Sequence, residues 1–101
     1  MSRATLAVLL SRVKPFSQPR WQWEQYVTPS EAAATILWDA QTRGLLEGRT
    51  VLDLGAGTGR LGIGALLLGA EVIFVEKDAS LHEAIEENIR AIQETIDHPL
   101  P

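Results

Sequence analysis

Apolar and polar positions recur along the chain with the periods of helices and strands. Over residues 3–13, three leucines and one valine recur every three or four positions, which is the spacing of one buried helix face. A second helix is expected to begin near Thr28. The side chains of Thr28 and Glu31 can each accept a hydrogen bond from the other residue's free backbone amide, and Pro29 suits the first helical position. Gly44 is the expected end of that helix.

The second half of the chain has the pattern strand, helix, strand, helix. Residues 50–54 and 72–75 are short apolar runs, typical of strands that helices cover. The small-residue stretch 59–68 between them predicts a helix, and a last helix would be capped by Asp78 or Ser80. Its apolar stripe consists of Leu81, Ile85, Ile89, Ile92 and Ile96. Parallel strands joined by a helical crossover are expected, so the predicted fold class is α/β, half of a doubly wound domain.

Composition excludes several classes of protein. The 101 residues are 46% hydrophobic and 22% charged, as in an ordinary soluble domain. The absence of cysteine excludes a disulfide framework, a thiolate zinc site and a cysteine nucleophile, and two histidines are too few for a His-rich metal site. No apolar run is long enough for a membrane span, and Arg12 and Lys14 stand where a signal peptide would have its cleavage site. A cytoplasmic location is therefore expected, with no metal.

Charge divides the chain into a basic arm and an acidic body. Residues 1–20 carry four basic and no acidic residues, whereas residues 21–101 carry five basic and thirteen acidic ones. The basic residues of the arm are Arg3, Arg12, Lys14 and Arg20. The arm is interpreted either as a contact for the phosphates of a nucleic acid or as a solvated helix face. Trp21 and Trp23, which follow it, would stack on bases or pack against the domain.

A glycine-rich loop follows the first expected strand. Residues 55–59 read Gly-Ala-Gly-Thr-Gly, so side chains are absent where a ligand would approach the backbone amides. The loop leads into a helix N-terminus, where free amides favour an anion. Asp53 precedes the loop, and Glu76 ends the second strand, where an acid commonly accepts hydrogen bonds from ribose hydroxyls.

Two cofactors that contain adenosine, NAD and S-adenosylmethionine, are considered for this loop. Residues 57–62 match the dinucleotide fingerprint G-x-G-x-x-G, although the first glycine comes late after the strand. Read from Asp53, the pattern is D-x-G-x-G-x-G, and an acid at the loop would repel a pyrophosphate. The same acid suits S-adenosylmethionine, which has an ammonium and a sulfonium group and no phosphate. S-adenosylmethionine is therefore favoured over NAD, and tight turns without any ligand are the third interpretation.

Three segments carry a resemblance to a known family. EQYVTP at 24–29, DLGAGTGRLGIGALLLGA at 53–70 and VEKD at 75–78 resemble the methyltransferase-like RNA adenine-N6 methyltransferases, which modify small-subunit ribosomal RNA. The resemblance covers residues 3–96. It implies a Rossmann-like class I methyltransferase fold, S-adenosylmethionine as cofactor, and direct methyl transfer to an adenine amino nitrogen.

The resemblance also assigns roles to individual residues. Asp53 and the glycines would surround the methionine end of the cofactor, and Glu76 would hold the ribose hydroxyls. Tyr26 and its neighbours would close the pocket, and Thr28 would combine this role with that of a helix cap. The full cofactor-binding set is Gln25, Tyr26, Thr28, Asp53, Gly55, Ala56, Gly57, Thr58, Gly59, Glu76 and Lys77.

The catalytic motif of that family, Asn-Pro-Pro-Phe, is absent from this sequence. The only asparagine is Asn88, in the last expected helix, so no catalytic residue is assigned. Residues 1–20 are interpreted as an N-terminal helix and basic linker, and residues 21–101 as the cofactor-binding half of a truncated methyltransferase domain. Self-association or a partner protein would cover its open sheet edges. The alternative is a non-catalytic module that binds S-adenosylmethionine or RNA.

Overall fold

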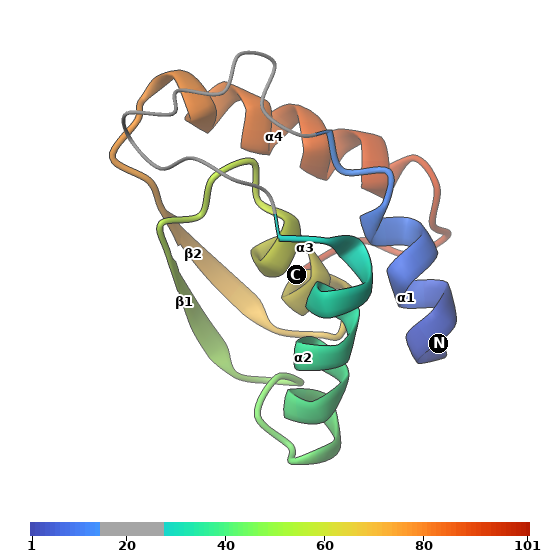
Figure 1. Ribbon diagram of the computed structural model, residues 1–101. Coiled ribbons are helices and arrows are strands. Elements are labelled where there is room, and N and C mark those ends of the chain that lie inside the picture. The colour runs from blue at the N-terminus through green and yellow to red at the C-terminus, as the bar shows by residue number, and fades with distance from the viewer. Residues whose placement is uncertain (15–27) are drawn as a thin grey trace.

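A computed structural model describes residues 1–14 and 28–101. The elements, labelled in Figure 1, are α1 (Arg3–Leu10), α2 (Ser30–Thr42), β1 (Thr50–Leu54), α3 (Arg60–Leu67), β2 (Glu71–Val75) and α4 (Ser80–Gln93). The two strands pair in parallel, from Thr50 beside Glu71 to Leu54 beside Val75. α3 connects them, so the predicted α/β architecture with a parallel sheet is confirmed. Each helix in these residues is too short or too polar to span a bilayer.

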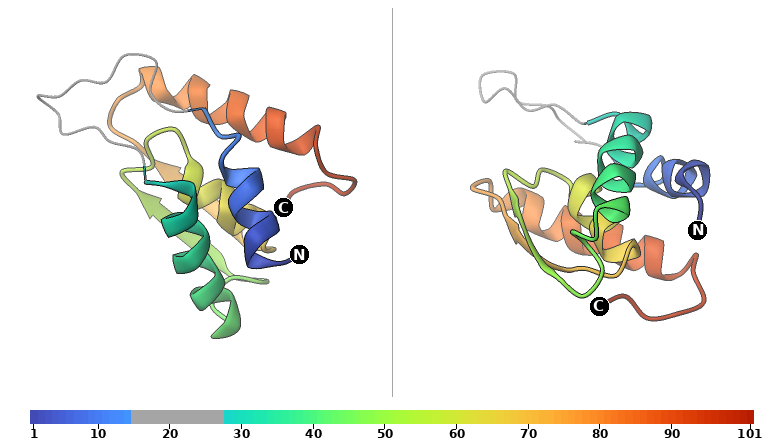
Figure 2. Two further views of the ribbon diagram at one scale, coloured as in Figure 1. Left: turned by 45° about the vertical axis from the view of Figure 1, so that its right-hand side comes forward. Right: turned by 90° about the horizontal axis from the view of Figure 1, so that it is seen from below.

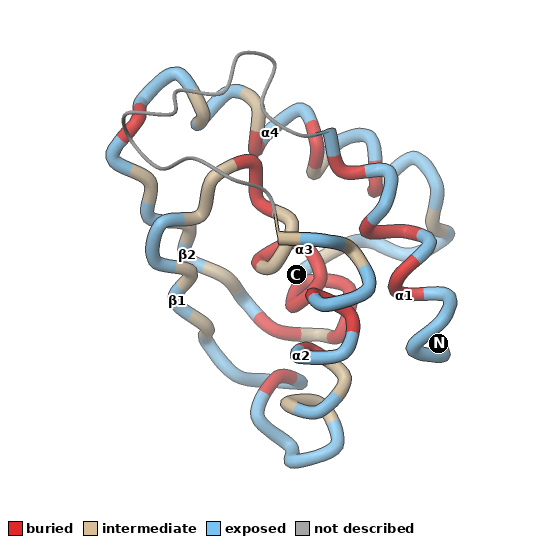
Figure 3. Tube along the Cα trace, in the orientation of Figure 1, coloured by how far each residue is buried: buried red, intermediate tan, exposed pale blue. Residues whose placement is uncertain are grey.

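The helices pack on one face of the sheet, as the views in Figure 2 show. Val51, Val72 and Phe74 point from the strands toward them and join the apolar core. The alternate strand residues face away, and Figure 3 shows exposed positions along both strands. The large apolar residues exposed on that face are Leu52, Leu54, Ile73 and Val75. One face of the sheet is thus bare, as expected for the first half of a doubly wound domain.

The core lies between α1, α2, α3 and the C-terminal part of α4. Its largest fully buried side chains are Leu6, Leu10, Val13, Ile63 and Ile92. The apolar stripe predicted for the first helix is buried, although α1 ends at Leu10 and Val13 lies in the turn that follows. Gly64 lets this layer pack closely, because a Cβ atom there would collide with the side chain of Leu37. Close packing of this kind stabilises the N-terminal helix against the α/β unit.

The predicted start of α2 is wrong in its details. The N-cap residue is Pro29, and no side chain caps the helix, so neither the Thr28 cap nor Pro29 as the first helical residue is found. Instead, the backbone carbonyl of Thr28 accepts a hydrogen bond from Arg60, which lies far away in sequence. The end of α2 is as predicted, since Gly44 has a φ of 72° beyond the last turn.

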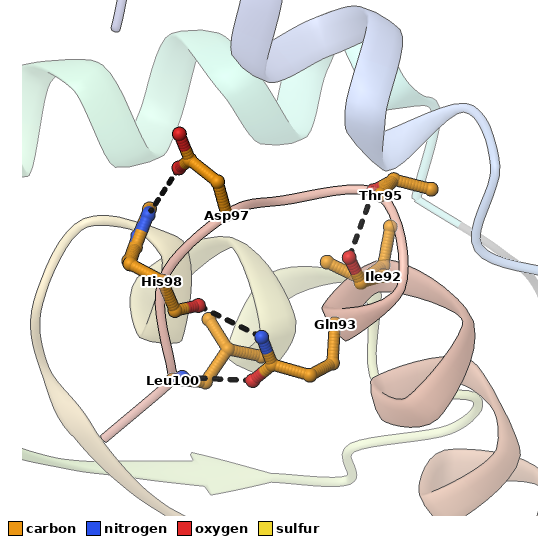
Figure 4. A network of polar contacts seen from close by, with 6 residues as sticks. All are labelled: Ile92, Gln93, Thr95, Asp97, His98 and Leu100. Carbon is orange, nitrogen blue, oxygen red and sulfur yellow. Dashed lines mark hydrogen bonds and ion pairs between the residues drawn. The ribbon is translucent and has the colours of Figure 1, made fainter.

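The two ends of α4 are held by side chains of neighbouring residues. At its start, the N-cap residue is Ala79 and no side chain caps the helix, so the cap predicted at Asp78 or Ser80 is not found. The Asp78 carboxylate accepts hydrogen bonds from the backbone amide and the hydroxyl of Ser80, the first helical residue. Beyond its end, the chain folds back along the helix, as Figure 4 shows. There the Gln93 amide donates to the carbonyl of His98 and accepts from the amide of Leu100.

Candidate cofactor-binding site

The glycine loop turns back over the end of β2. The amides of Gly55 and Ala56 both donate to the carbonyl of Val75, at 2.8 and 3.0 Å. Gly55, Gly57 and Gly59 have φ angles of 68°, 60° and 95°. Side chains are strained in that region, so the three alternate glycines are required for the path of the chain. The loop and the C-terminal ends of both strands therefore lie together at one edge of the sheet.

Glu76 joins the two segments that form this edge. Its Oε1 accepts a hydrogen bond from the Gly57 amide at 2.8 Å, and its Oε2 accepts one from the Asp78 amide at 2.9 Å. Its backbone carbonyl lies 2.7 Å from Nε2 of His82 on α4. A carboxylate has about four lone-pair positions, so two amides leave acceptor capacity for further donors. Glu76 thus stabilises the loop through these hydrogen bonds, and its carboxylate oxygens can still accept hydrogen bonds from ligand hydroxyls.

Asp53 is the second carboxylate at this edge. It is half-buried, and its Oδ2 accepts a hydrogen bond from the Gly62 amide of α3 at 3.0 Å. Burial raises the pKa of Asp53, and the nearby charge of Glu76 raises it further, whereas the Gly62 hydrogen bond acts in the opposite direction. Within the described residues, both carboxylates are hydrogen-bonded by backbone amides alone. The two negative charges suit a positively charged ligand.

Gly62 is a site residue that the D-x-G-x-G-x-G pattern misses. A Cβ atom at Gly62 would collide with the ring of Phe74 and lie 2.8 Å from Oδ2 of Asp53. Its amide is also the donor to Asp53, so Gly62 lets α3 lie directly on the sheet and hold the carboxylate. The competing G-x-G-x-x-G pattern contained the signal, because its last glycine commonly allows close packing of helix and strand.

Two further side chains, also missed from the sequence, tie distant segments to the loop. Arg60, the first residue of α3, donates to the carbonyls of Thr28 and Val13, both at 2.8 Å. Asn88 of α4 accepts from the Lys14 amide at 3.0 Å and donates to the Lys14 carbonyl at 3.2 Å and to the Thr58 carbonyl at 3.0 Å. The chain before residue 15 and the chain after residue 27 therefore both meet the glycine loop.

The described part of the predicted site is brought together at this edge. Asp53, residues 55–59 and Glu76 lie within one hydrogen-bonded unit, and Thr28 is attached to it through Arg60. Lys77 is exposed beside Glu76. The residues of the candidate sites that lie outside the described part of the chain are Arg20, Gln25 and Tyr26, as well as Trp21 and Trp23.

The basic arm has three residues in the described part. Arg12 and Lys14 are exposed just beyond α1, where Asn88 holds the Lys14 backbone beside the loop. Arg3 lies near the other end of α1 and donates to the Thr35 hydroxyl of α2 at 3.3 Å. The backbone of Lys14 is thus attached to the candidate site, whereas Arg3 contacts α2.

Comparison with known proteins adds the family. Residues 32–98 match the family model described as Conserved hypothetical protein 95. The chain belongs to this family. The crystal structure of PH1948 from Pyrococcus horikoshii, provisionally named an RNA methyltransferase, superposes with a TM-score of 0.85 and 48% sequence identity, over 90% of this chain and 46% of that one. The expected resemblance to methyltransferases is confirmed.

Two curated relatives extend this similarity. The uncharacterized protein MJ0284 of Methanocaldococcus jannaschii is 36% identical over 91% of this chain and 42% of its own length. The Drosophila melanogaster protein named rRNA N(6)-adenosine-methyltransferase Mettl5 is 42% identical over 62% of this chain and 30% of its own length. The chain therefore spans less than half the length of these relatives.

Proposed function

We propose that this chain binds S-adenosylmethionine and forms the cofactor-binding half of a methyltransferase that acts on RNA. The observation that carries the proposal is the meeting of two carboxylates, Asp53 and Glu76, at a glycine loop beyond the ends of two parallel strands. Ligands of open α/β sheets bind at this end of the strands. S-adenosylmethionine brings a sulfonium and an ammonium group to a site with two negative charges, and when bound it supplies an electrophilic methyl group.

The residues present fit this cofactor. Asp53 would attract the cationic methionine end, and the approach of a cation would offset the burial and the repulsion from Glu76 that raise its pKa. Glu76 would accept hydrogen bonds from the ribose hydroxyls with its remaining lone pairs. The alternate glycines would allow the cofactor to lie against the backbone. In this proposal Thr28 and the neighbouring Gln25 and Tyr26 would close the pocket.

The hydrogen bonds of the loop favour S-adenosylmethionine over a dinucleotide. A pyrophosphate requires free backbone amides at the loop and at the start of the following helix. Here the Gly57 amide donates to Glu76 and the Gly62 amide donates to Asp53, so two such donors already serve carboxylates. A phosphate at the loop would also meet both negative charges. The G-x-G-x-x-G pattern is therefore explained by packing at Gly62 and does not require NAD.

The RNA substrate is proposed from the relatives and from charge. One relative is named an adenosine methyltransferase of ribosomal RNA, and we extend this target, adenine N6, to the present chain. Arg12 and Lys14 are exposed, and the Lys14 backbone is held by Asn88; in this proposal both side chains would contact phosphates, and Arg3 and Arg20 would extend this contact. The target base would be positioned by residues outside this chain, because the family's Asn-Pro-Pro-Phe motif is absent. A cytoplasmic location belongs to the same proposal.

The bare face of the sheet is proposed to bind a second polypeptide or a second copy of the chain. Leu52, Leu54, Ile73 and Val75 expose between 43% and 71% of their surface on this face. Exposed apolar side chains that lie side by side on two paired strands are typical of a contact surface. A polypeptide packed on this face would bury these apolar side chains and could contribute the residues that hold the base.

A calorimetric titration of the 101-residue chain with S-adenosylmethionine tests the proposal. We expect micromolar binding to the chain and to the control variant Asp39→Ala, because Asp39 is exposed and paired with Arg43 on α2. We expect no measurable binding to Asp53→Ala and none of NADH to the unmodified chain. Absence of S-adenosylmethionine binding to a chain that circular dichroism shows to be folded would refute the proposal, and preferential binding of NADH would support the dinucleotide interpretation.

A further inference from the structure

Arg60 occupies an unfavourable position for a cation. It is the first residue of α3, where the helix dipole already places partial positive charge. Burial lowers the pKa of its guanidinium group, and its Nε atom is buried without a hydrogen-bond partner among the described residues. In addition, the proposed ligand of the adjacent loop is itself a cation. The position of Arg60 must therefore be explained by the contacts that its guanidinium group makes.

Those contacts are backbone carbonyls on two segments that are distant in sequence. Nη1 donates to Thr28 and Nη2 to Val13, both at 2.8 Å, so one planar group bridges the two segments. Charge-assisted hydrogen bonds of this kind are stronger than those between neutral groups. Because Arg60 directly follows Gly59, the bridge attaches both segments to the glycine loop itself. Its Nη groups serve protein carbonyls, so Arg60 is not positioned as a cofactor ligand.

Asn88 forms a second bridge of the same kind. Its side chain, only 3% exposed, joins both backbone groups of Lys14 to the carbonyl of Thr58 in the loop. The Val13–Lys14 segment is therefore fixed from two sides. The Thr28 segment, by contrast, is held to the loop by Arg60, and its hydroxyl does not cap α2. Among the described residues, the Thr28 hydroxyl thus has no role as a helix cap.

We infer that Arg60 is a positioning residue that aligns Thr28 with the glycine loop, so that the Thr28 hydroxyl contacts S-adenosylmethionine. The inference rests on the proposed cofactor site and assigns the tertiary contact that assembles it. Arg60→Met removes both donors while keeping an aliphatic side chain. We expect this change to weaken S-adenosylmethionine binding about tenfold, because Thr28 would lose its anchor. The cofactor affinity of Arg43→Met is expected to be unchanged, since Arg43 is an exposed arginine at the end of α2.

A double-mutant cycle separates positioning from general stabilisation. Thr28→Val removes the hydroxyl but keeps the carbonyl that Arg60 binds. If Arg60 acts through Thr28, Arg60→Met has little further effect on cofactor affinity in the Thr28→Val background. If Arg60 merely stabilises the fold, the two fold-changes multiply. Calorimetric titration of the full chain and its three variants, with a thermal melt of each, supplies both measurements.

Each outcome of this cycle decides the inference. A tenfold loss that disappears in the Thr28→Val background supports it. Unchanged affinity in either single variant, or fold-changes that multiply, would overturn it while leaving the proposed function intact. If the unmodified chain does not bind S-adenosylmethionine, the proposed function and the inference fail together. Should Arg60→Met not fold, Arg60→Lys keeps the charge with a single donor group and carries the same cycle, with an intermediate loss expected.

Discussion

Asp53→Asn separates the function of the site from its stability. Asparagine has about the volume of aspartate and keeps an oxygen that can accept the hydrogen bond from the Gly62 amide. It removes the negative charge beside Glu76. Because the pKa of Asp53 is raised in the folded chain, ionised Asp53 destabilises the fold. This penalty is absent below the ordinary pKa of 3.8 and complete above the raised pKa. At pH 7, the free energy of unfolding of Asp53→Asn is expected to equal or exceed that of the unmodified chain.

Cofactor affinity is expected to change in the opposite direction. A hydrogen bond to a charged group contributes about 1.5–3 kcal/mol, which corresponds to about a ten- to hundredfold rise in the Kd for S-adenosylmethionine. The affinity of the unmodified chain should also fall as pH decreases through the raised pKa of Asp53, because the protonated carboxyl no longer attracts a cation. Asp53→Asn should lack this part of the pH dependence.

Urea unfolding and calorimetric titration measure the two quantities at several pH values. Asp39→Asn, on the exposed surface of α2, is the matched control and should leave S-adenosylmethionine affinity unchanged. A less stable Asp53→Asn chain with normal cofactor affinity would refute the reasoning, because it would show that the charge serves the fold and not the ligand.

Three further changes test other parts of the structure. Glu76→Gln should weaken S-adenosylmethionine binding about tenfold or more in a titration and lower the free energy of unfolding by about 1–3 kcal/mol, because one backbone amide loses its acceptor; equal affinity would contradict the ribose role. Gly62→Ala should lower the free energy of unfolding in urea by about 1–3 kcal/mol, because its Cβ collides with Phe74; an unchanged midpoint would contradict the packing. Leu54→Lys, at a position 71% exposed, should change stability by less than about 0.5 kcal/mol and reduce self-association in sedimentation; a large destabilisation would contradict the exposure of this face.

Local signals predicted most of the secondary structure. The first strand matches its expected bounds, because a short apolar run is followed at once by glycines that no strand continues through. The second begins one residue earlier than expected, at Glu71. The alternate glycines of residues 55–59 have the positive φ that a loop between strand and helix requires. These features depend on neighbours within a few residues, and so they can be inferred from the sequence alone.

The cap predicted for α2 is absent from the structure. Thr28 and Glu31 have the spacing of a capping box, yet the structure has no side-chain cap at this helix. Arg60 instead hydrogen-bonds the Thr28 carbonyl from 32 residues away. This long-range contact involves the carbonyl of Thr28 and not its hydroxyl, and the spacing of residues 28–31 carries no sign of it.

The order of elements, the glycine loop and the pair of acidic strand ends are properties of the sequence, because periodicity, glycine conformation and charge act locally. The tertiary structure decided which partners these residues have. It brought Glu76 to the Gly57 amide, Asp53 to the Gly62 amide, and Arg60 to carbonyls on both sides of residues 15–27. Such contacts join segments that are 9 to 47 residues apart, and they form only when the packing of α3 and the two strands places donor and acceptor within hydrogen-bond distance.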